Sequence, residues 1–469
     1  MDYQFIFREM EFERSSKYKH NDISIANIFH YLHSDKICYV VESKAWFTYN
    51  GKHWEKDECS LTIMELCKNF VQALATYGEA FAFVDDDGKA FAKYTSGFHT
   101  RRKREGLLSD ARSIAPKSLN DFDRNKLLFN CKNGTFNLQT MTLQRHSPSD
   151  FISKMANVQF VEDATCERWG RFIKEIMCED NETAIFLQKA LGYALSGDTA
   201  LECFFILYGN TTRNGKSTLT ETIANIFGDY ARNVQPQTLA KRSSDGGVAT
   251  PDIARLKGAR LVNTPEPEKG LELNIALIKQ LTGGDTYTSR ALYENLVEFK
   301  PEFKIFINTN HLPRSADDTV FTSNRVKLIP FDRHFNPQEQ DNGLKKQFRK
   351  GINKSAILNW LITGYKLLQA EGLTVPSRVA NAIASYRQET DIFGQFLFDC
   401  TAHQENNRLS TSELYSAYTG WVKDDGYRQM NNKNFVAELR RRFDVRRDGG
   451  TGNVVIGLVV CLEPNPFVA

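Results

Sequence analysis

A glycine-rich turn that ends in lysine and serine has the composition of a phosphate-binding loop. Gly209 opens the segment GNTTRNGKST, between an apolar run at residues 203–208 and a helical pattern at 219–227. In such a strand–loop–helix unit, the loop's backbone N–H groups and the helix N-terminus face the phosphates. The residues predicted to bind ATP are Gly209, Asn214, Gly215, Lys216, Ser217 and Thr218.

Lys216 and Ser217 have separate expected tasks in this loop. Lys216 is expected to reach the β- and γ-phosphates, and the Ser217 hydroxyl to ligate Mg²⁺. The spacing departs from the usual pattern, because Asn210 stands where the first glycine is expected and the glycine is Gly209. The alternative is a polar turn that contains Gly-Lys-Ser by chance, which the neighbouring apolar run and helical pattern disfavour.

Two carboxylates follow the next strand-like run, at residues 260–263. Glu266 and Glu268 lie in the segment TPEPE, where the prolines favour an extended backbone. A carboxylate at the carboxyl end of a strand beside a phosphate loop supports Mg²⁺ or activates the attacking water. Glu266 is therefore also a predicted metal ligand. The sequence leaves open which glutamate is the base, and a solvated acidic turn is the alternative.

Two further polar residues belong to the predicted catalytic set. Asn310 follows a third strand-like run, at 303–308, where an amide can orient the attacking water. The alternative for Asn310 is a residue that only caps the turn. Arg325 precedes the apolar segment VKLIPF and could reach a neighbouring subunit's γ-phosphate, or it could form a structural ion pair.

A predicted β-hairpin around residues 293–295 has the chemistry of a contact with single-stranded DNA. Cations suit phosphates and an aromatic ring suits a base. The alternative is a surface hairpin with ordinary basic residues. The predicted contacts are Lys279, Arg290, Tyr293 and Lys300.

The segment 391–469 resembles a small module that binds duplex DNA. Residues 431–442 have a helical pattern that ends in three arginines, and a strand, a glycine-rich turn and a strand follow. Helix, turn, basic helix and β-wing predict a winged helix. The alternative is a winged helix that contacts only protein. The predicted DNA contacts are Arg440, Arg441, Arg442 and Arg446.

The middle of the chain must position the phosphate loop and the residues around it. Short apolar runs alternate there with helical patterns, which predicts an α/β fold with a parallel sheet covered by helices. Residues 37–49 and 127–138 predict two β-hairpins in a mixed α/β N-terminal region.

Composition restricts the partners and the compartment. The net charge is only +3, so any DNA must bind at local basic patches. The nine cysteines form no C-x-x-C pair, which favours reduced thiols in a cytoplasm, such as that of a bacterial host. No apolar run approaches the roughly 20 residues that span a membrane.

The order of these motifs resembles the superfamily 3 helicases, and specifically the phage/plasmid and poxvirus-type primase-helicase family. The matching segments are GNTTRNGKST, PEPEKG, LIKQLTGGD, FKPEFK, NTNHLP and RVKLIPF. The resemblance extends upstream through NGT at 133–135 and LGYALSGDT at 191–199, so it covers most of the chain from about residue 120 onward.

This resemblance implies an AAA+ motor in a ring, usually hexameric, with ATP sites between subunits and 3′-to-5′ movement on single-stranded DNA. By position, it assigns ATP and Mg²⁺ to Lys216 and Ser217, the acidic function to Glu266 or Glu268, the sensor to Asn310 and the finger to Arg325. The acidic motif differs from the paired aspartates of some members. The implied partners are single-stranded and forked DNA, origin duplex, further copies of the chain, and a separate primase and polymerase.

The expected organisation is a series of five segments. They are a mixed α/β region at 1–165, a helical collar at 166–196, the motor at 197–335, a helical connection at 336–390 and the winged-helix-like domain at 391–469.

Other functions are weighed against an ATP-driven DNA helicase. Primase activity is not expected, because Asp121 and Asp123 follow no apolar strand and residues 85–88 are typical of a hairpin turn. An origin-binding initiator, whose ATPase drives assembly with little unwinding, is the main alternative. A small-molecule kinase is a more distant alternative, which a monomeric state and a DNA-independent ATPase would favour.

Overall fold

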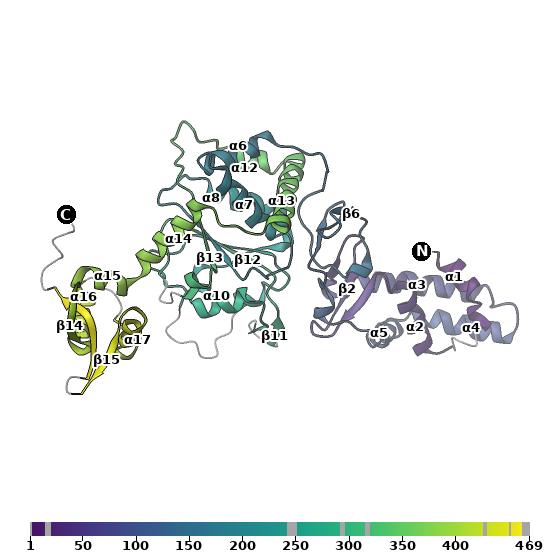
Figure 1. Cartoon of the computed structure of the whole chain (residues 1–469). Coiled ribbons are helices and arrows are strands. Elements are labelled where there is room, and N and C mark those ends of the chain that lie inside the picture. Colours follow the sequence, from purple (N-terminus) through teal and green to yellow (C-terminus); the bar gives the residue numbers. More distant parts are fainter. Residues whose placement is uncertain are drawn as a thin grey trace.

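The computed structural model describes residues 2–14, 20–241, 251–290, 296–314, 319–424, 429–449 and 452–461. Figure 1 shows three parts in a row, with the N-terminal part at one end, the parallel sheet in the middle and the C-terminal part at the other end.

The N-terminal part combines helices with a small antiparallel sheet. Its core is rich in aromatic side chains, with Phe7, Phe29 and Phe70 buried together. The order β1-β2-β3 confirms the first predicted hairpin region. The elements are α1 (Tyr3–Glu9), α2 (Asp22–His33), β1 (Ile37–Val40), β2 (Ala45–Tyr49), β3 (Trp54–Lys56), α3 (Leu61–Glu79), α4 (Asp86–Ser96) and α5 (Arg101–Ala111).

A second antiparallel sheet packs on the central part. It contains β4 (Leu128–Cys131), β5 (Gly134–Asn137) and β6 (Thr142–Gln144), and the pairing of β4 with β5 confirms the second predicted hairpin. Phe129 stacks on Tyr230 of the central part, with ring centroids 4.9 Å apart. Residues 1–165 therefore contribute to more than one core.

The central part contains the predicted parallel sheet, in the order β13-β7-β12-β9-β8. Its strands are β7 (Phe204–Tyr208), β8 (Ala231–Asn233), β9 (Leu261–Thr264), β12 (Lys304–Thr309) and β13 (Val326–Pro330). The neighbouring pairs are all parallel. Because β7 is buried along most of its length, its apolar sequence suits a strand covered on both faces.

Helices and one hairpin surround this sheet. The elements are α8 (Lys216–Phe227), α9 (Pro251–Ala254), α10 (Ile275–Thr282), β10 (Tyr287–Arg290), β11 (Leu296–Phe299) and α11 (Thr319–Thr322). The antiparallel pairing of β10 with β11 confirms the predicted hairpin.

The predicted helical segments on either side of the sheet pack against each other. They are α6 (Glu167–Ile176) and α7 (Asn181–Tyr193), then α12 (Leu344–Phe348), α13 (Gly351–Glu371) and α14 (Ser377–Thr390). A Cβ atom on Gly192 would lie 2.4 Å from the Tyr365 nitrogen, and one on Gly364 would lie 2.2 Å from the Gln188 carbonyl oxygen. Only glycine allows the backbones of α7 and α13 to approach this closely.

The C-terminal part is built on a three-stranded sheet in the order β14-β16-β15. Its elements are α15 (Ile392–Cys400), β14 (Thr401–Ser410), α16 (Thr411–Asp424), α17 (Asn432–Arg442), β15 (Val445–Asp448) and β16 (Gly452–Val460). Helix α17 and the β15–β16 pairing confirm the predicted helix and hairpin. Strand β14 was not predicted.

Candidate functional site: the carboxyl edge of the parallel sheet

The glycine-rich loop joins β7 to α8 and folds back on itself. Asn214 Nδ2 donates a hydrogen bond to the Thr211 carbonyl across the loop, at 2.7 Å. Gly215 precedes α8 with a φ of +87°, a conformation that favours glycine. At Gly209, a Cβ atom would lie 2.5 Å from the Phe331 carbonyl and 3.2 Å from Lys216 Nζ. The loop is one residue longer than usual, and its first glycine, Gly209, lies where the side chain of Lys216 packs.

Three predicted residues from three segments form a continuous hydrogen-bonded chain. Lys216 Nζ donates to Asn310 Oδ1 at 2.6 Å. Asn310 donates to Glu266 twice, from its backbone nitrogen at 3.1 Å and from Nδ2 at 3.0 Å. The structure therefore brings together the loop lysine, the amide after β12 and the carboxylate after β9.

Strand order explains why these side chains meet. Strand β12 lies between β7 and β9, and all three run parallel. Their carboxyl ends therefore share one edge of the sheet, with Asn310 between Lys216 and Glu266. This edge is where ligands bind in open parallel sheets.

Burial changes the acid–base behaviour of Lys216. Its side chain is buried at the start of α8. Burial lowers the pKa of Lys216 to about 8, and the nearby Glu266 carboxylate opposes part of that shift. An anion beside Lys216 would stabilise its ammonium form and raise its pKa again.

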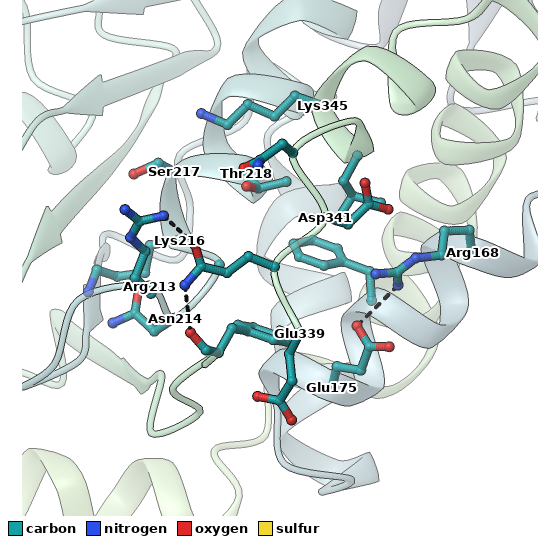
Figure 2. Close-up of a pocket in the computed structure, with 16 residues that line it drawn as sticks. Arg168, Glu175, Arg213, Asn214, Lys216, Ser217, Thr218, Glu339, Asp341 and Lys345 are labelled. Carbon is teal, nitrogen blue, oxygen red and sulfur yellow. Dashed lines mark hydrogen bonds and ion pairs between the residues drawn. The ribbon is translucent and has the colours of Figure 1, made fainter. Parts of the chain in front are cut away.

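A cavity of about 440 Å³ opens beside the loop, and its lining includes Lys216 but neither Asn310 nor Glu266. Figure 2 shows Lys216, Ser217 and Thr218 along one wall and the Arg168–Glu175 pair of α6 opposite. That ion pair measures 3.1 Å. Apolar side chains complete the lining, and they are Phe172, Phe335 and Leu344.

The segment after β13 closes this cavity over the loop. Phe335 N donates to the Arg213 carbonyl at 2.9 Å, and Arg213 Nη1 donates to Gln340 Oε1 at 2.5 Å. His334 Nδ1 lies 2.8 Å from the Thr212 carbonyl. The sequence did not single out this segment or Arg168, because nothing in its pattern indicated that α6 and residues 333–345 would cover the loop.

The two remaining predicted catalytic residues lie elsewhere. Glu268 is exposed, and its carbonyl accepts a hydrogen bond from Leu271 N. Arg325 precedes β13, at the opposite edge of the sheet from Lys216. Its guanidinium forms an ion pair with Glu202 and donates to Thr282 Oγ1 at 3.0 Å. The structure does not bring Arg325 to this chain's own cavity, and its ion pair matches the structural alternative.

The predicted single-strand contacts gather around the β10–β11 hairpin only in part. Arg290 ends β10 and Lys300 follows β11, where it is exposed. Tyr293 lies outside the described residues. Lys279, on α10, donates instead to Thr319 Oγ1 beside α11.

The four predicted duplex-binding arginines also have different surroundings. Arg440 is exposed, and Arg441 pairs with Glu438 on the same helix at 2.5 Å. Arg446 pairs with Asp444 at 2.7 Å. Arg442 binds both oxygens of Asp391, at 2.8 and 2.9 Å, and its guanidinium lies 5.0 Å from the Phe393 ring centroid. Arg442 therefore faces its own module.

One turn in the N-terminal region was predicted wrongly. Residues 85–88 form no hairpin turn, because Asp85 caps α4 and accepts a hydrogen bond from Gly88 N at 2.6 Å.

The two aspartates that were weighed as metal ligands of a primase bind backbone groups. Asp123 accepts a hydrogen bond from Ser153 N at 2.8 Å, and Asp121 accepts one from Ser118 N at 2.8 Å. In the described ranges, no cluster of three or more His, Cys, Asp or Glu residues could hold a metal ion.

Fold and site together define a mixed α/β protein with a glycine-rich loop, a lysine, an amide and a carboxylate at one edge of a parallel sheet. No helix in the described ranges is both long and apolar enough to cross a membrane.

Three family descriptions match successive parts of the chain. Residues 26–178 match "D5 N terminal like", residues 207–325 match a family of unknown function, DUF5906, and residues 388–450 match "Poxvirus D5 protein-like". The middle match contains Lys216, Glu266 and Asn310.

Viral proteins with helicase names are similar over long stretches. "Putative helicase L207/L206" of Acanthamoeba polyphaga mimivirus is 26% identical, over 83% of this chain and 44% of its own length. "Putative helicase 022R" of Frog virus 3 is 27% identical, over 54% of this chain and 27% of its own length. "Putative helicase V13" of Sputnik virophage is 22% identical, over 73% of this chain and 47% of its own length. The chain thus spans less than half the length of these relatives.

The fold also resembles a solved structure. The apo C-terminal region of NrS-1, residues 305–718, superimposes with a TM-score of 0.50 and 11% identity, over 94% of this chain and all of that one. The D5 descriptions match both ends of the chain and the viral relatives carry helicase names, and together these matches support a D5-like primase-helicase family.

Proposed function

We propose that this chain is the ATP-driven motor of a DNA helicase that acts in replication. The observation that carries the proposal is the chain of hydrogen bonds from Lys216 through Asn310 to Glu266 at the carboxyl edge of the sheet. A phosphate-binding cation, a water-orienting amide and a base are the groups that hydrolysis of a γ-phosphate requires.

The residues present fit ATP with Mg²⁺. Lys216 and Ser217 both line the cavity, and Ser217 is exposed. Ser217 and Glu266 would hold Mg²⁺, which neutralises charge on the phosphates when bound. The cavity is lined in part by Phe172 and Phe335 and not by Glu266, and the base and ribose would fit there.

Glu266 is the stronger candidate for the base. Its two oxygens accept from Asn310, so the carboxylate and the amide hold a fixed geometry at the phosphate end. In the proposed reaction, Asn310 orients a water molecule and Glu266 accepts its proton. The water oxygen bonds to the γ-phosphorus while the bond from that phosphorus to the β–γ bridging oxygen breaks, so that ADP leaves. Both glutamates are exposed, and Asn310 donates to Glu266 rather than to Glu268 in the part of the chain that the structure describes.

The strand order β13-β7-β12-β9-β8 supports an AAA+ motor. The resemblance to superfamily 3 helicases adds a ring, usually hexameric. In such a ring the ATP sites lie between subunits. A finger role for Arg325 requires its guanidinium to leave Glu202 and Thr282 when a neighbouring subunit docks. Single-stranded DNA would follow the β10–β11 hairpin, with Arg290 at the end of β10 next to the turn and Lys300 just beyond the opposite end of the hairpin.

The C-terminal part supports a winged helix that binds duplex DNA. Two helices, α16 and α17, precede a β-hairpin, and β14 completes the sheet. Arg440 and Arg441 lie on α17, opposite its buried Phe435 and Leu439. Cations on the outer face of a helix suit the phosphates beside a groove.

The catalytic assignment is tested by exchanging one glutamate at a time for glutamine and measuring steady-state ATP hydrolysis. Glu266→Gln is expected to lower kcat about a hundredfold, because glutamine cannot accept the proton, and to raise KM as well, because Glu266 is also a proposed Mg²⁺ ligand. Glu268→Gln, the matched control, is expected to stay within about threefold of the intact protein. Equal losses, or a larger loss in the control, would contradict the assignment.

A further inference from the structure

A buried tyrosine on α14 anchors the loop that carries Asn310. Tyr386 donates its hydroxyl hydrogen to the Pro313 carbonyl at 2.6 Å. Its side chain is only 1% exposed, and its ring meets Phe321 edge to face, with centroids 5.0 Å apart. Burial raises the pKa of Tyr386, so its hydroxyl stays a donor at any pH at which the protein is studied.

The anchored loop is short and is held at each end. At its start, Asn310 binds Glu266 through its backbone nitrogen and its side chain. At its end, Arg314 N donates to the Leu271 carbonyl at 2.7 Å, and Leu273 N donates to the Arg314 carbonyl at 3.0 Å. Tyr386 adds a hydrogen bond from a different element, at Pro313, directly before the end that Arg314 holds.

The hydrogen bond also ties the loop to the helix that leads to the C-terminal part. Figure 1 shows α14 running from the central sheet toward that part. Near its start, Arg378 binds Asp332, which follows β13, at 2.6 Å. Beyond its end, Asp391 caps α15 and binds Arg442. A displacement of α14 therefore acts on the Pro313 carbonyl.

We infer that Tyr386 is a positioning residue for Asn310, through which α14 sets the geometry of the hydrolytic site. The inference rests on the proposed function, because it assigns Asn310 to the attacking water. Without the Tyr386 hydroxyl, the buried Pro313 carbonyl loses this hydrogen-bond donor, which costs free energy. A shift of the loop toward another donor recovers part of that free energy. Asn310 then leaves the position in which it spans Lys216 and Glu266.

The test compares ATP hydrolysis by the intact protein, Tyr386→Phe and Tyr193→Phe. Tyr386→Phe keeps the ring and is expected to lower kcat about tenfold with KM for ATP unchanged, because misplacement by a fraction of an ångström slows an oriented reaction. Tyr193 is an equally buried tyrosine, whose hydroxyl accepts from Leu201 N at 3.2 Å near the opposite edge of the sheet. Tyr193→Phe is expected to keep the intact kcat.

A double variant separates positioning from a general loss of stability. If Tyr386 acts through Asn310, then Tyr386→Phe changes kcat by less than about twofold in an Asn310→Ala background. Intact kcat in Tyr386→Phe, or effects of the two substitutions that multiply, would overturn the inference. Failure of the proposed function looks different, since Lys216→Ala would then hydrolyse ATP as fast as the intact protein.

Discussion

At the scale of single residues, Lys216 is a cation that its own burial makes easy to deprotonate. Because its pKa lies near 8, the ammonium form predominates at neutral pH and is lost as the pH rises through that value. The phosphates of ATP bind the ammonium form. Affinity for ATP should therefore be highest below pH 8.

This dependence gives a prediction for nucleotide binding. The dissociation constant for ATP, measured by titration calorimetry, is expected to rise about tenfold per unit above pH 8. The matched control is Lys216→Arg, because its guanidinium keeps its charge over this range. The control should bind with an affinity that does not depend on pH between 7 and 9.5. Equal affinity of the intact protein at both ends of that range would contradict the role given to Lys216.

Part of this site could be predicted from residue types alone. Lys216, Glu266 and Asn310 each follow a strand-like run, and parallel strands bring such positions to one edge. Tyr386 could not be predicted in this way, because it lies 76 positions beyond Asn310 (386 − 310) on a helix whose docking site the sequence does not encode locally. The contact of Arg213 could not be predicted either, because its partner Gln340 follows β13, far along the sequence.

At the scale of elements, α17 divides its arginines between two faces. Arg442 follows Leu439 by three residues and shares its inward face, where it holds Asp391. Arg440 is exposed on the other face. The sequence pattern identified the helix and the basic cluster, but Asp391 and Phe393 decide which arginine turns inward.

Substitutions on the two faces are therefore expected to have different effects. Arg440→Ala should weaken binding to duplex DNA about tenfold and reduce the salt dependence by about one phosphate contact, measured by fluorescence anisotropy. Arg442→Gln should lower the stability of the C-terminal part by about 1 kcal/mol, a modest value because the pair with Asp391 is about a third exposed. Thermal melting measures the second effect. The division of roles is wrong if Arg442→Gln changes the salt dependence and Arg440→Ala does not.

The elements that escaped prediction have a common cause. Strand β14 has the polar sequence TAHQENNRLS and lies at an edge of its sheet, with a register irregularity between His403 and Arg408, so no apolar alternation marks it. Helix α4 begins at an aspartate run that also suits a turn, and only the cap at Asp85 distinguishes the two. Strands β7, β9 and β12 were predictable because burial on both faces makes their sequences apolar.

At the scale of the whole molecule, the three parts have separate cores that the chain links in order. The N-terminal aromatic cluster, the two clusters around the parallel sheet and the C-terminal cluster each contain their own buried side chains. Helix α14 contacts both the sheet and the junction with α15. The proposed motor thus has a physical link to the part proposed to bind duplex DNA.

The central claim, that the sheet edge drives strand separation, is tested most directly by ATP-dependent unwinding of a forked DNA. The intact protein and Lys216→Ala are compared at equal DNA occupancy. Unwinding is expected from the intact protein and none from Lys216→Ala, since the variant lacks the cation that binds the phosphates. An intact protein that hydrolyses ATP and binds duplex DNA, yet separates no strands, would rule out the helicase function and favour an origin-binding initiator.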